Sequence, residues 1–180
     1  MAAVKTKLIK NFFTIEELKI LQKYCYDKLD KIKIININDW DPNVFSPAWY
    51  DDSLMNSFLQ YKLPLVEKKS NLKLFPTYAY WRYYVFGATL SEHLDRPSCE
   101  ISLSSCIKKY DNWPLTVEKK SFELEEGDAI LYAGCDQKHG RPGVYKGEGM
   151  AQVFFHYVNK NGPHTKHAYD NYYKETGKQR

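Results

Sequence analysis

Hydrophobic residues recur at a helical period in the first part of the chain and at a strand period later. Leu18, Leu21 and Cys25 follow Thr14 at spacings of three and four, and a Glu stands three residues after Thr14. A hydroxyl residue followed by Glu at this spacing is typical of a capped helix start. The pattern predicts a helix over residues 14–29.

A second helical pattern begins at Leu54. Its apolar positions continue to Pro64, so a helix is expected that far and beyond it. The segment between the two helices contains several Asn, Asp and Pro residues, which interrupt any period. It is expected to hold a short strand at residues 34–37 and then a loop over residues 39–50. The two helices form an N-terminal support over residues 8–70.

From Tyr78 onwards the pattern changes to β-branched and aromatic runs broken by Gly and Pro, which is typical of successive strands. The runs predict strands over residues 78–86, 99–107, 115–117, 122–124, 129–133 and 151–158. Short strands at this spacing favour an antiparallel sandwich or jelly roll, with the helices covering one sheet. The fold class is therefore mainly β with N-terminal helices (α+β), in a single domain over residues 1–180. Its β core spans residues 76–158, and a tail over residues 159–180 has no clear period.

Composition narrows the possible partners. The 180 residues are 43% hydrophobic with a net charge of +4, and the basic residues are scattered, so charge does not indicate a nucleic acid or membrane partner. The Tyr and Trp side chains could stack on single-stranded nucleic acid, but the lysines do not cluster along the aromatic strand. The first 13 residues lack the apolar core of a signal peptide, and no apolar run reaches the length of a membrane span. A cytoplasmic protein is expected, with no nucleic acid and no membrane partner.

The four cysteines, Cys25, Cys99, Cys106 and Cys135, form no CxxC pair. Zinc sites built from Cys need closer spacing, and disulfide scaffolds need a higher density of Cys. The four side chains are expected to be reduced and to pack as small hydrophobic residues.

His93 and Asp95 form the first chemical signal, an H-x-D pair. If this segment is extended, residues two apart face the same side, so an imidazole and a carboxylate would lie side by side as two possible metal ligands. For the pair alone, a surface or salt-bridged pair is the favoured explanation. A third ligand is needed before the pair indicates a metal site.

Among the remaining histidines, His139 is the best candidate for a third ligand. His164 and His167 lie in the polar tail, and His156 lies inside an aromatic strand where packing is the simpler explanation. In a rolled sheet, distant strands become neighbours, so His139 could complete a triad. Two imidazoles and one carboxylate with open positions suit Fe(II) that also binds a co-substrate and O2.

The ordered set of motifs resembles the Fe(II)- and 2-oxoglutarate-dependent dioxygenases. It consists of H-x-D, then E-x-G-D-A leading into a hydrophobic strand, then His139, then an aromatic final strand. The prefix Tyr84-x-x-Gly87 and the lead-in Asn-Phe-Phe-Thr-Ile-Glu-Glu-Leu at residues 11–18 resemble the prolyl 4-hydroxylase branch. A block made of residues 76–78, 82, 87, 93–102, 113–114 and 152–158 is similar to small phage and bacterial members of that branch. The resemblance covers residues 8–158, and its specific part covers 76–158. It implies a double-stranded β-helix, which is a jelly roll or cupin-like fold.

The resemblance also implies an activity. His93, Asp95 and His139 match the metal ligands of that family, and Tyr84 matches a tyrosine that contacts 2-oxoglutarate. The implied cofactors are Fe(II), 2-oxoglutarate as co-substrate, O2, and ascorbate as a reductant. The implied reaction hydroxylates an unactivated C–H bond of a prolyl residue in a peptide or protein, with release of succinate and CO2. A small-molecule substrate stays open.

One position departs from the family pattern. About ten residues after the distal His the family has a Lys or Arg that pairs with the far carboxylate of 2-oxoglutarate, whereas this chain has Gly149. A partly buried dianion needs a cation or several donors. Arg82 shares a strand face with Tyr84, and Arg141 stands two residues after the distal His, so both are candidate co-substrate ligands. Lys146 and Lys108 are weaker candidates. A structural ion pair, with Glu100 or Asp95 as a possible partner, is the alternative for each of them.

The missing cation leaves a rival function open. A cupin-like module that has lost catalysis would use the same barrel to hold a ligand or a partner. The presence of two His and one Asp facing one cavity counts against that alternative, because a module without catalytic activity has no physical need for these three ligands. Stoichiometric iron would favour the enzyme.

Overall fold

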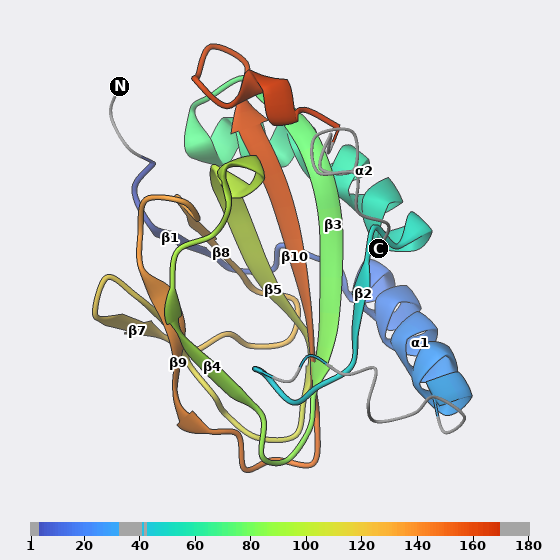
Figure 1. The fold of residues 1–180 in the computed structure, drawn as a ribbon. Helices are drawn as coiled ribbons and strands as arrows, with labels where there is room; N and C mark the ends of the chain where they lie inside the picture. Colours follow the sequence, from blue (N-terminus) through green and yellow to red (C-terminus); the bar gives the residue numbers. More distant parts are fainter. Residues whose placement is uncertain (1–3, 33–40, 42, 170–180) are drawn as a thin grey trace.

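The chain folds as two antiparallel sheets packed face to face (Figure 1). The structure is a computed structural model, and it describes residues 4–32, 41 and 43–169. The larger sheet has the strand order β1-β8-β5-β10-β3-β2, and the smaller sheet has the order β4-β9-β6-β7. The strands of the larger sheet are β1 (Lys7–Ile9), β2 (Ala48–Tyr50), β3 (Leu74–Tyr84), β5 (Ile101–Lys109), β8 (Ala129–Tyr132) and β10 (Met150–Asn159). Those of the smaller sheet are β4 (Thr89–His93), β6 (Leu115–Val117), β7 (Lys120–Phe122) and β9 (His139–Val144). The expected jelly-roll fold, mainly β with N-terminal helices, is confirmed.

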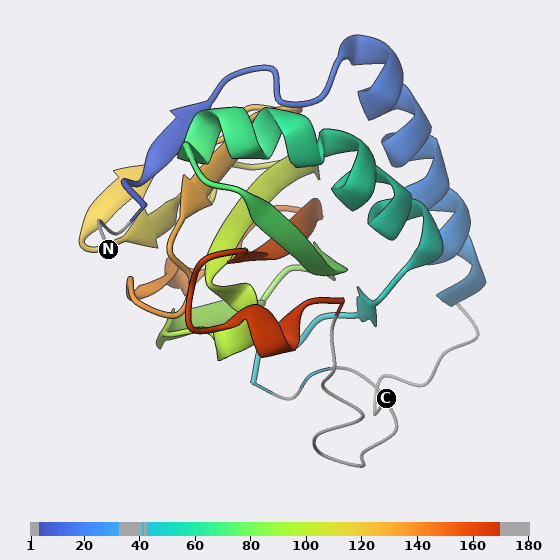
Figure 2. The same cartoon turned by 90° about the horizontal axis from the view of Figure 1, so that it is seen from above.

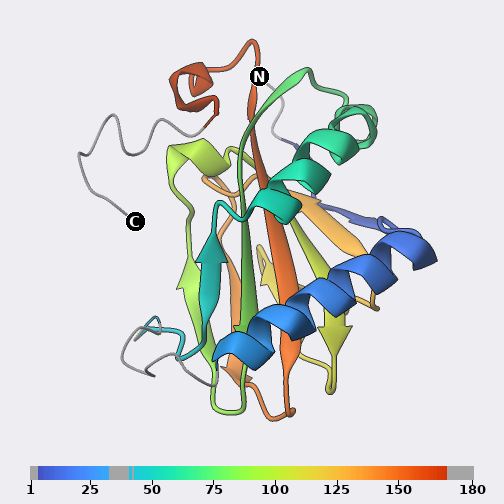
Figure 3. The ribbon, with the colours of Figure 1, turned by 90° about the vertical axis from the view of Figure 1, so that its right-hand side faces the viewer.

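Two helices, α1 (Ile15–Ile32) and α2 (Ser53–Ser70), cover the outer face of the larger sheet (Figures 2 and 3). The predicted capped start is confirmed: Thr14 Oγ1 accepts from the Glu17 N–H at 3.2 Å, and Glu17 Oε2 accepts from the Thr14 N–H at 2.8 Å. This reciprocal pair satisfies two backbone donors that a helix start leaves free. Helix α2 continues through Pro64, as the apolar period predicts.

Alternation along β3 divides its side chains between two environments. Ala79 and Trp81 are fully buried in the hydrophobic core beneath the helices, together with Leu21 of α1 and Met55 and Leu59 of α2. Successive strand residues point to opposite faces, so Tyr78, Tyr80, Arg82 and Tyr84 of β3 face the smaller sheet instead. One face of β3 therefore packs against the helices, and the other face lines a cavity between the sheets.

Several strand predictions need correction. The prediction for 115–117 is confirmed, and those for 129–133 and 151–158 differ by one residue at one or both ends. The strand predicted at 78–86 is β3, which begins at Leu74 and ends at Tyr84. The strand predicted at 99–107 is β5, which begins at Ile101, after a short 3-10 helix at Pro97–Cys99. The predicted strand at 122–124 lies earlier, as β7. The strand expected at 34–37 lies outside the described residues.

Four strands, β1, β2, β4 and β9, have no counterpart in the sequence-based prediction. β9 contains two glycines and a proline, which favour a loop when considered locally. It forms because it pairs with β4 on one side and β6 on the other. β2 lies within the segment predicted as a loop and adds a short edge strand to β3. A separate finding is that, of the helices in the described residues, none is both long and apolar enough to cross a bilayer.

Candidate metal centre

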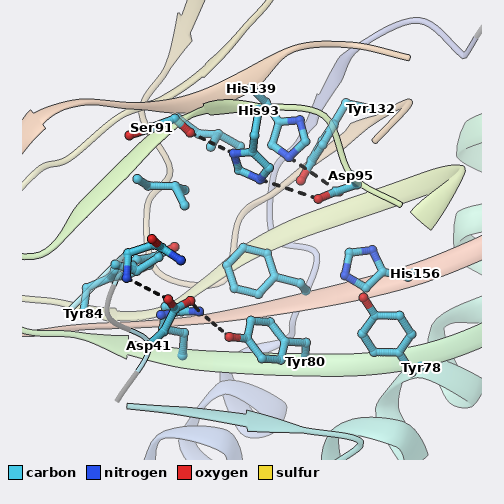
Figure 4. Close-up of a pocket in the computed structure, with 16 residues that line it drawn as sticks. Asp41, Tyr78, Tyr80, Tyr84, Ser91, His93, Asp95, Tyr132, His139 and His156 are labelled. Carbon is cyan, nitrogen blue, oxygen red and sulfur yellow. Dashed lines mark hydrogen bonds and ion pairs between the residues drawn. The ribbon is translucent and has the colours of Figure 1, made fainter. Parts of the chain in front are cut away.

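Three predicted ligands meet where β4 and β9 pair. His93 is the last residue of β4 and His139 the first residue of β9, and the two are partners in the antiparallel register. Asp95 lies two residues beyond β4, and its N–H donates to the Gly134 carbonyl at 2.9 Å. His93 Nε2 lies 3.6 Å from Asp95 Oδ1, and His139 Nε2 lies 3.5 Å from Asp95 Oδ2. Figure 4 shows the three side chains converging.

Each imidazole is oriented by a backbone carbonyl two residues before it. His93 Nδ1 lies 2.8 Å from the Ser91 carbonyl oxygen, and His139 Nδ1 lies 2.9 Å from the Gln137 carbonyl oxygen. A carbonyl oxygen only accepts, so Nδ1 carries a proton. In the metal-free protein a proton on Nε2 faces Asp95, and loss of this proton would give a metal ion the Nε2 lone pair. Metal-binding histidines commonly have this arrangement. The donor set of two Nε2 atoms and one carboxylate fits a divalent transition metal with positions left for other ligands.

The electrostatics favour a cation at this place. Burial alone would raise the pKa of Asp95, but its hydrogen-bonding contacts with His139 and His93 outweigh burial and hold that pKa well below the ordinary value. The same contact raises the pKa of His93. Asp95 is therefore ionised at neutral pH and supplies one negative charge to the centre.

Gly134 is required for this geometry. A Cβ at this position would lie 2.5 Å from the Cys99 carbonyl oxygen, 2.5 Å from Ser102 Oγ and 2.6 Å from Asp95 Oδ2. Real side chains do not approach so closely, so any other residue would displace the carboxylate or the backbone beside it. The Gly is part of the centre although it donates no ligand.

The triad lies on the wall of a cavity of about 380 Å³ between the two sheets. The opposite wall carries Tyr78, Tyr80 and Tyr84 from β3 (Figure 4). Phe154 from β10 also lines the cavity. The structure thus places Tyr84 in the same cavity as the triad. A cavity with aromatic walls and a few converging polar groups is typical of a small-molecule or cofactor site.

Arg82 faces the cavity but its charge is already neutralised. Its Nη2 lies 2.9 Å from Asp41 Oδ2 and also donates to the Tyr80 hydroxyl, and its Nη1 lies 2.9 Å from Ser46 Oγ. Among the described residues its carboxylate partner is therefore Asp41, not Glu100 or Asp95. The pair fixes the segment around Asp41 to the cavity wall.

Arg141 is buried without a carboxylate partner in the described part of the chain. It is 6% exposed, its Nη1 donates to the Trp113 carbonyl oxygen, and its Nε and Nη2 have no partner among the described residues. The guanidinium carbon lies 5.6 Å from the centre of the Tyr84 ring and 5.3 Å from that of Trp113. Buried polar groups are nearly always hydrogen-bonded, so two unpartnered nitrogens beside Tyr84 mark a place for an anion.

The position of Gly149 explains the departure from the family pattern. A Cβ at Gly149 would coincide with the hydroxyl group of Tyr83. No larger side chain fits there while Tyr83 keeps its place. The structure therefore has no room for a Lys or Arg at this position.

His156 has a larger role than the sequence indicates. It lines the cavity, and its Nδ1 lies 2.9 Å from Ser102 Oγ, which is 3.5 Å from Asp95 Oδ2. Burial lowers the pKa of His156 to about 4, so the ring is neutral at pH 7. Strand alternation places His156 on the same face as Phe154, and from this spacing the sequence could have indicated that His156 lines the cavity. Asp41 was missed because it lies in a segment with no period.

No family model matches the chain, and no curated protein sequence matches it. Solved structures do. A viral collagen prolyl hydroxylase from Paramecium bursaria Chlorella virus-1, in complex with 2-oxoglutarate, is 13% identical, with a TM-score of 0.61 over 84% of this chain and 94% of that one. A Pseudomonas putida prolyl-4-hydroxylase is 13% identical, with a TM-score of 0.65 over 87% and 93% of the two chains.

HygX from Streptomyces hygroscopicus, with nickel and 2-oxoglutarate bound, is 12% identical, with a TM-score of 0.64 over 88% of this chain and 84% of that one. The chain has the fold of the 2-oxoglutarate- and Fe(II)-dependent oxygenases. The resemblance found in the sequence is therefore confirmed for the fold. At these identities the fold is what the likeness establishes, and the reaction must be argued from the site.

Proposed function

We propose that this protein is an Fe(II)- and 2-oxoglutarate-dependent oxygenase that hydroxylates an unactivated C–H bond. The observation that carries the proposal is the convergence of His93, Asp95 and His139 on one wall of a cavity that Tyr84 also lines. The buried guanidinium of Arg141 lies 5.6 Å from the Tyr84 ring, and two of its nitrogens have no partner among the described residues. When bound, iron and 2-oxoglutarate supply the oxidising power with O2, and the co-substrate leaves as succinate and CO2.

Charge balance favours Arg141 as the co-substrate ligand. A divalent ion with ionised Asp95 leaves one positive charge, and the dianionic co-substrate reverses it to one negative charge. Arg141 brings the sum to zero, whereas Arg82 cannot, because Asp41 already cancels its charge. Burying a neutral set of groups costs far less than burying a net charge. Arg141 would hold the far carboxylate through Nε and Nη2, with the Tyr84 hydroxyl beside it.

The other residues orient and shield the reacting groups. The Ser91 and Gln137 carbonyls hold the imidazole rings so that Nε2 points inwards. The aromatic side chains of β3 and β10 line the cavity and exclude water from it, which strengthens every electrostatic interaction inside. Ascorbate would serve only to keep iron reduced between turnovers.

A prolyl residue of a peptide or protein is our proposed substrate. Tyr80 and Phe154 present aromatic faces with ring centres 5.7 Å apart, suited to contact a pyrrolidine ring. Two of the similar structures are prolyl hydroxylases by name. Mass spectrometry of proline-containing peptides should show the gain of one oxygen at proline. Oxygen gained at another residue would refute the prolyl substrate and keep the oxygenase.

The oxygenase itself is tested without knowing the substrate. Fe(II) and then 2-oxoglutarate are added anaerobically to the full chain, and a weak visible metal-to-ligand charge-transfer band is followed. We expect a saturable band that is lost in His139→Ala and kept in the matched control His164→Ala, whose ring lies in the tail. No band with iron bound would refute 2-oxoglutarate as the co-substrate.

A further inference from the structure

A second set of metal-ligating side chains lies directly behind the triad. Asp95, Cys99 and His156 each bring one potential ligand atom, and these atoms lie within 4.8 Å of one another. Cys99 and His156 are 2% and 5% exposed. The three come from different parts of the fold: the segment after β4, the 3-10 helix Pro97–Cys99, and β10.

We propose that Asp95, Cys99 and His156 form a binding site for a thiophilic divalent metal ion of the zinc and cadmium class. A thiolate and an imidazole select such ions over Mg²⁺, Ca²⁺ or Mn²⁺. The site does not rest on the proposed oxygenase function, because it needs neither 2-oxoglutarate nor turnover.

The charge of the site suits its burial. On binding, Cys99 exchanges its S–H bond for an S–metal bond and its proton leaves to solvent, with no change in oxidation state. The ion with the Asp95 carboxylate and the Cys99 thiolate is then electrically neutral, whereas the triad with the same ion keeps one positive charge. Burying an electrically neutral group of ion and ligands costs little free energy compared with burying a net charge.

The surroundings complete the site and provide an entrance. The Tyr78 hydroxyl lies 3.1 Å from Cys99 Sγ, where it can donate to the thiolate, and Ser102 Oγ lies 2.9 Å from His156 Nδ1. Such outer contacts orient ligands and raise metal affinity. Asp95, His156 and Tyr78 all line the cavity, so an ion can reach the site through it.

Asp95 belongs to both sets of ligands, and this has a consequence for the triad. Both carboxylate oxygens face the imidazoles of His93 and His139, at 3.6 Å and 3.5 Å. An ion held by Cys99 and His156 draws this carboxylate away from the triad. The two sites are therefore alternatives, and a thiophilic ion would displace the metal of the triad.

The first test is Cd²⁺ titration of the metal-free full chain under reducing conditions, followed by sulfur-to-cadmium absorption in the near ultraviolet. We expect one saturable sulfur-bound ion per chain, lost in Cys99→Ser and kept in the matched control Cys135→Ser, whose thiol is half-buried elsewhere. His93→Ala/His139→Ala should keep the band and His156→Gln should weaken binding about tenfold. A band that survives Cys99→Ser, or its absence from the wild type, would overturn the proposal. If Cys99→Ser does not fold, the His156→Gln shift decides.

The second test measures competition. Mn²⁺ at the triad is followed by electron paramagnetic resonance while Cd²⁺ is added. One equivalent of Cd²⁺ should release Mn²⁺ from the wild type, and Cys99→Ser should need about tenfold more. Equal release from both proteins would show that Cys99 does not attract the ion, and simultaneous binding of both metals would refute the shared carboxylate. Neither outcome bears on whether the Fe(II) and 2-oxoglutarate band forms.

Discussion

Replacing Arg141 with Met should make the free protein more stable while it weakens co-substrate binding. If Arg141 had a structural role, the same substitution would lower the free energy of unfolding. Met has a similar length and no polar atoms that need partners. The reason for the expected gain is that Nε and Nη2 of Arg141 have no partner among the described residues.

The magnitude follows from the contacts. An uncompensated buried charge costs about 3–5 kcal/mol. Removing it also gives up one charged hydrogen bond, from Nη1 to the Trp113 carbonyl, worth about 1.5–3 kcal/mol. The net gain in the free energy of unfolding is on the order of 1–2 kcal/mol, which raises Tm by about 2–8 °C for a chain of this size. Removing one partner of a buried charge pair costs about 2–5 kcal/mol, so affinity for 2-oxoglutarate should fall at least about 30-fold.

The assay is urea and thermal unfolding of the chelator-treated protein, together with 2-oxoglutarate titration by the charge-transfer band. Arg82→Met is the matched control. Arg82 is paired with Asp41 and Ser46, so its removal should lower stability. If Arg141→Met destabilises the protein and leaves 2-oxoglutarate affinity unchanged, the charge argument is refuted and Arg141 is structural.

Three further predictions concern the surroundings of the triad. Gly134→Ala should cost about 1–3 kcal/mol of stability and weaken Mn²⁺ binding in calorimetry, because its Cβ would displace the carboxylate of Asp95; full-strength binding would contradict this. The folded pKa of His156, about 4, lies below its unfolded value, so the unfolded state binds the extra proton and stability falls as pH drops from about 6.5 to 4. Chelator-treated His156→Gln should lose up to about 1.4 kcal/mol per pH unit of that slope in urea unfolding, and an unchanged slope would show that another group is responsible. Thr14→Ala should lower the free energy of unfolding by about 1 kcal/mol through loss of the helix cap, with Thr6→Ala as a comparison outside the helix.

The local sequence determined the elements that depend on near neighbours. Thr14 and Glu17 lie three residues apart, so the start of α1 could be recognised without any tertiary contact. The strands with continuous β-branched and aromatic residues, such as β6 and β10, were placed within one residue at each end because their side chains suit a pleated surface in any fold. The H-x-D spacing likewise placed His93 and Asp95 side by side.

Only the tertiary structure decided what depends on distant partners. β9 carries residues that favour a loop and becomes a strand because β4 and β6 supply its hydrogen bonds, and that pairing brings His139 to His93. The two arginines were equal candidates in sequence, but Asp41 pairs with Arg82, while Arg141 is buried with unpartnered nitrogens among the described residues. Cys99 and His156 were predicted to be packing residues, and only the 3-10 helix Pro97–Cys99 and β10 bring them next to Asp95. Residue types and their spacing show which functional groups the chain has. Burial and contacts with residues far along the chain decide which of these groups can bind a ligand or react.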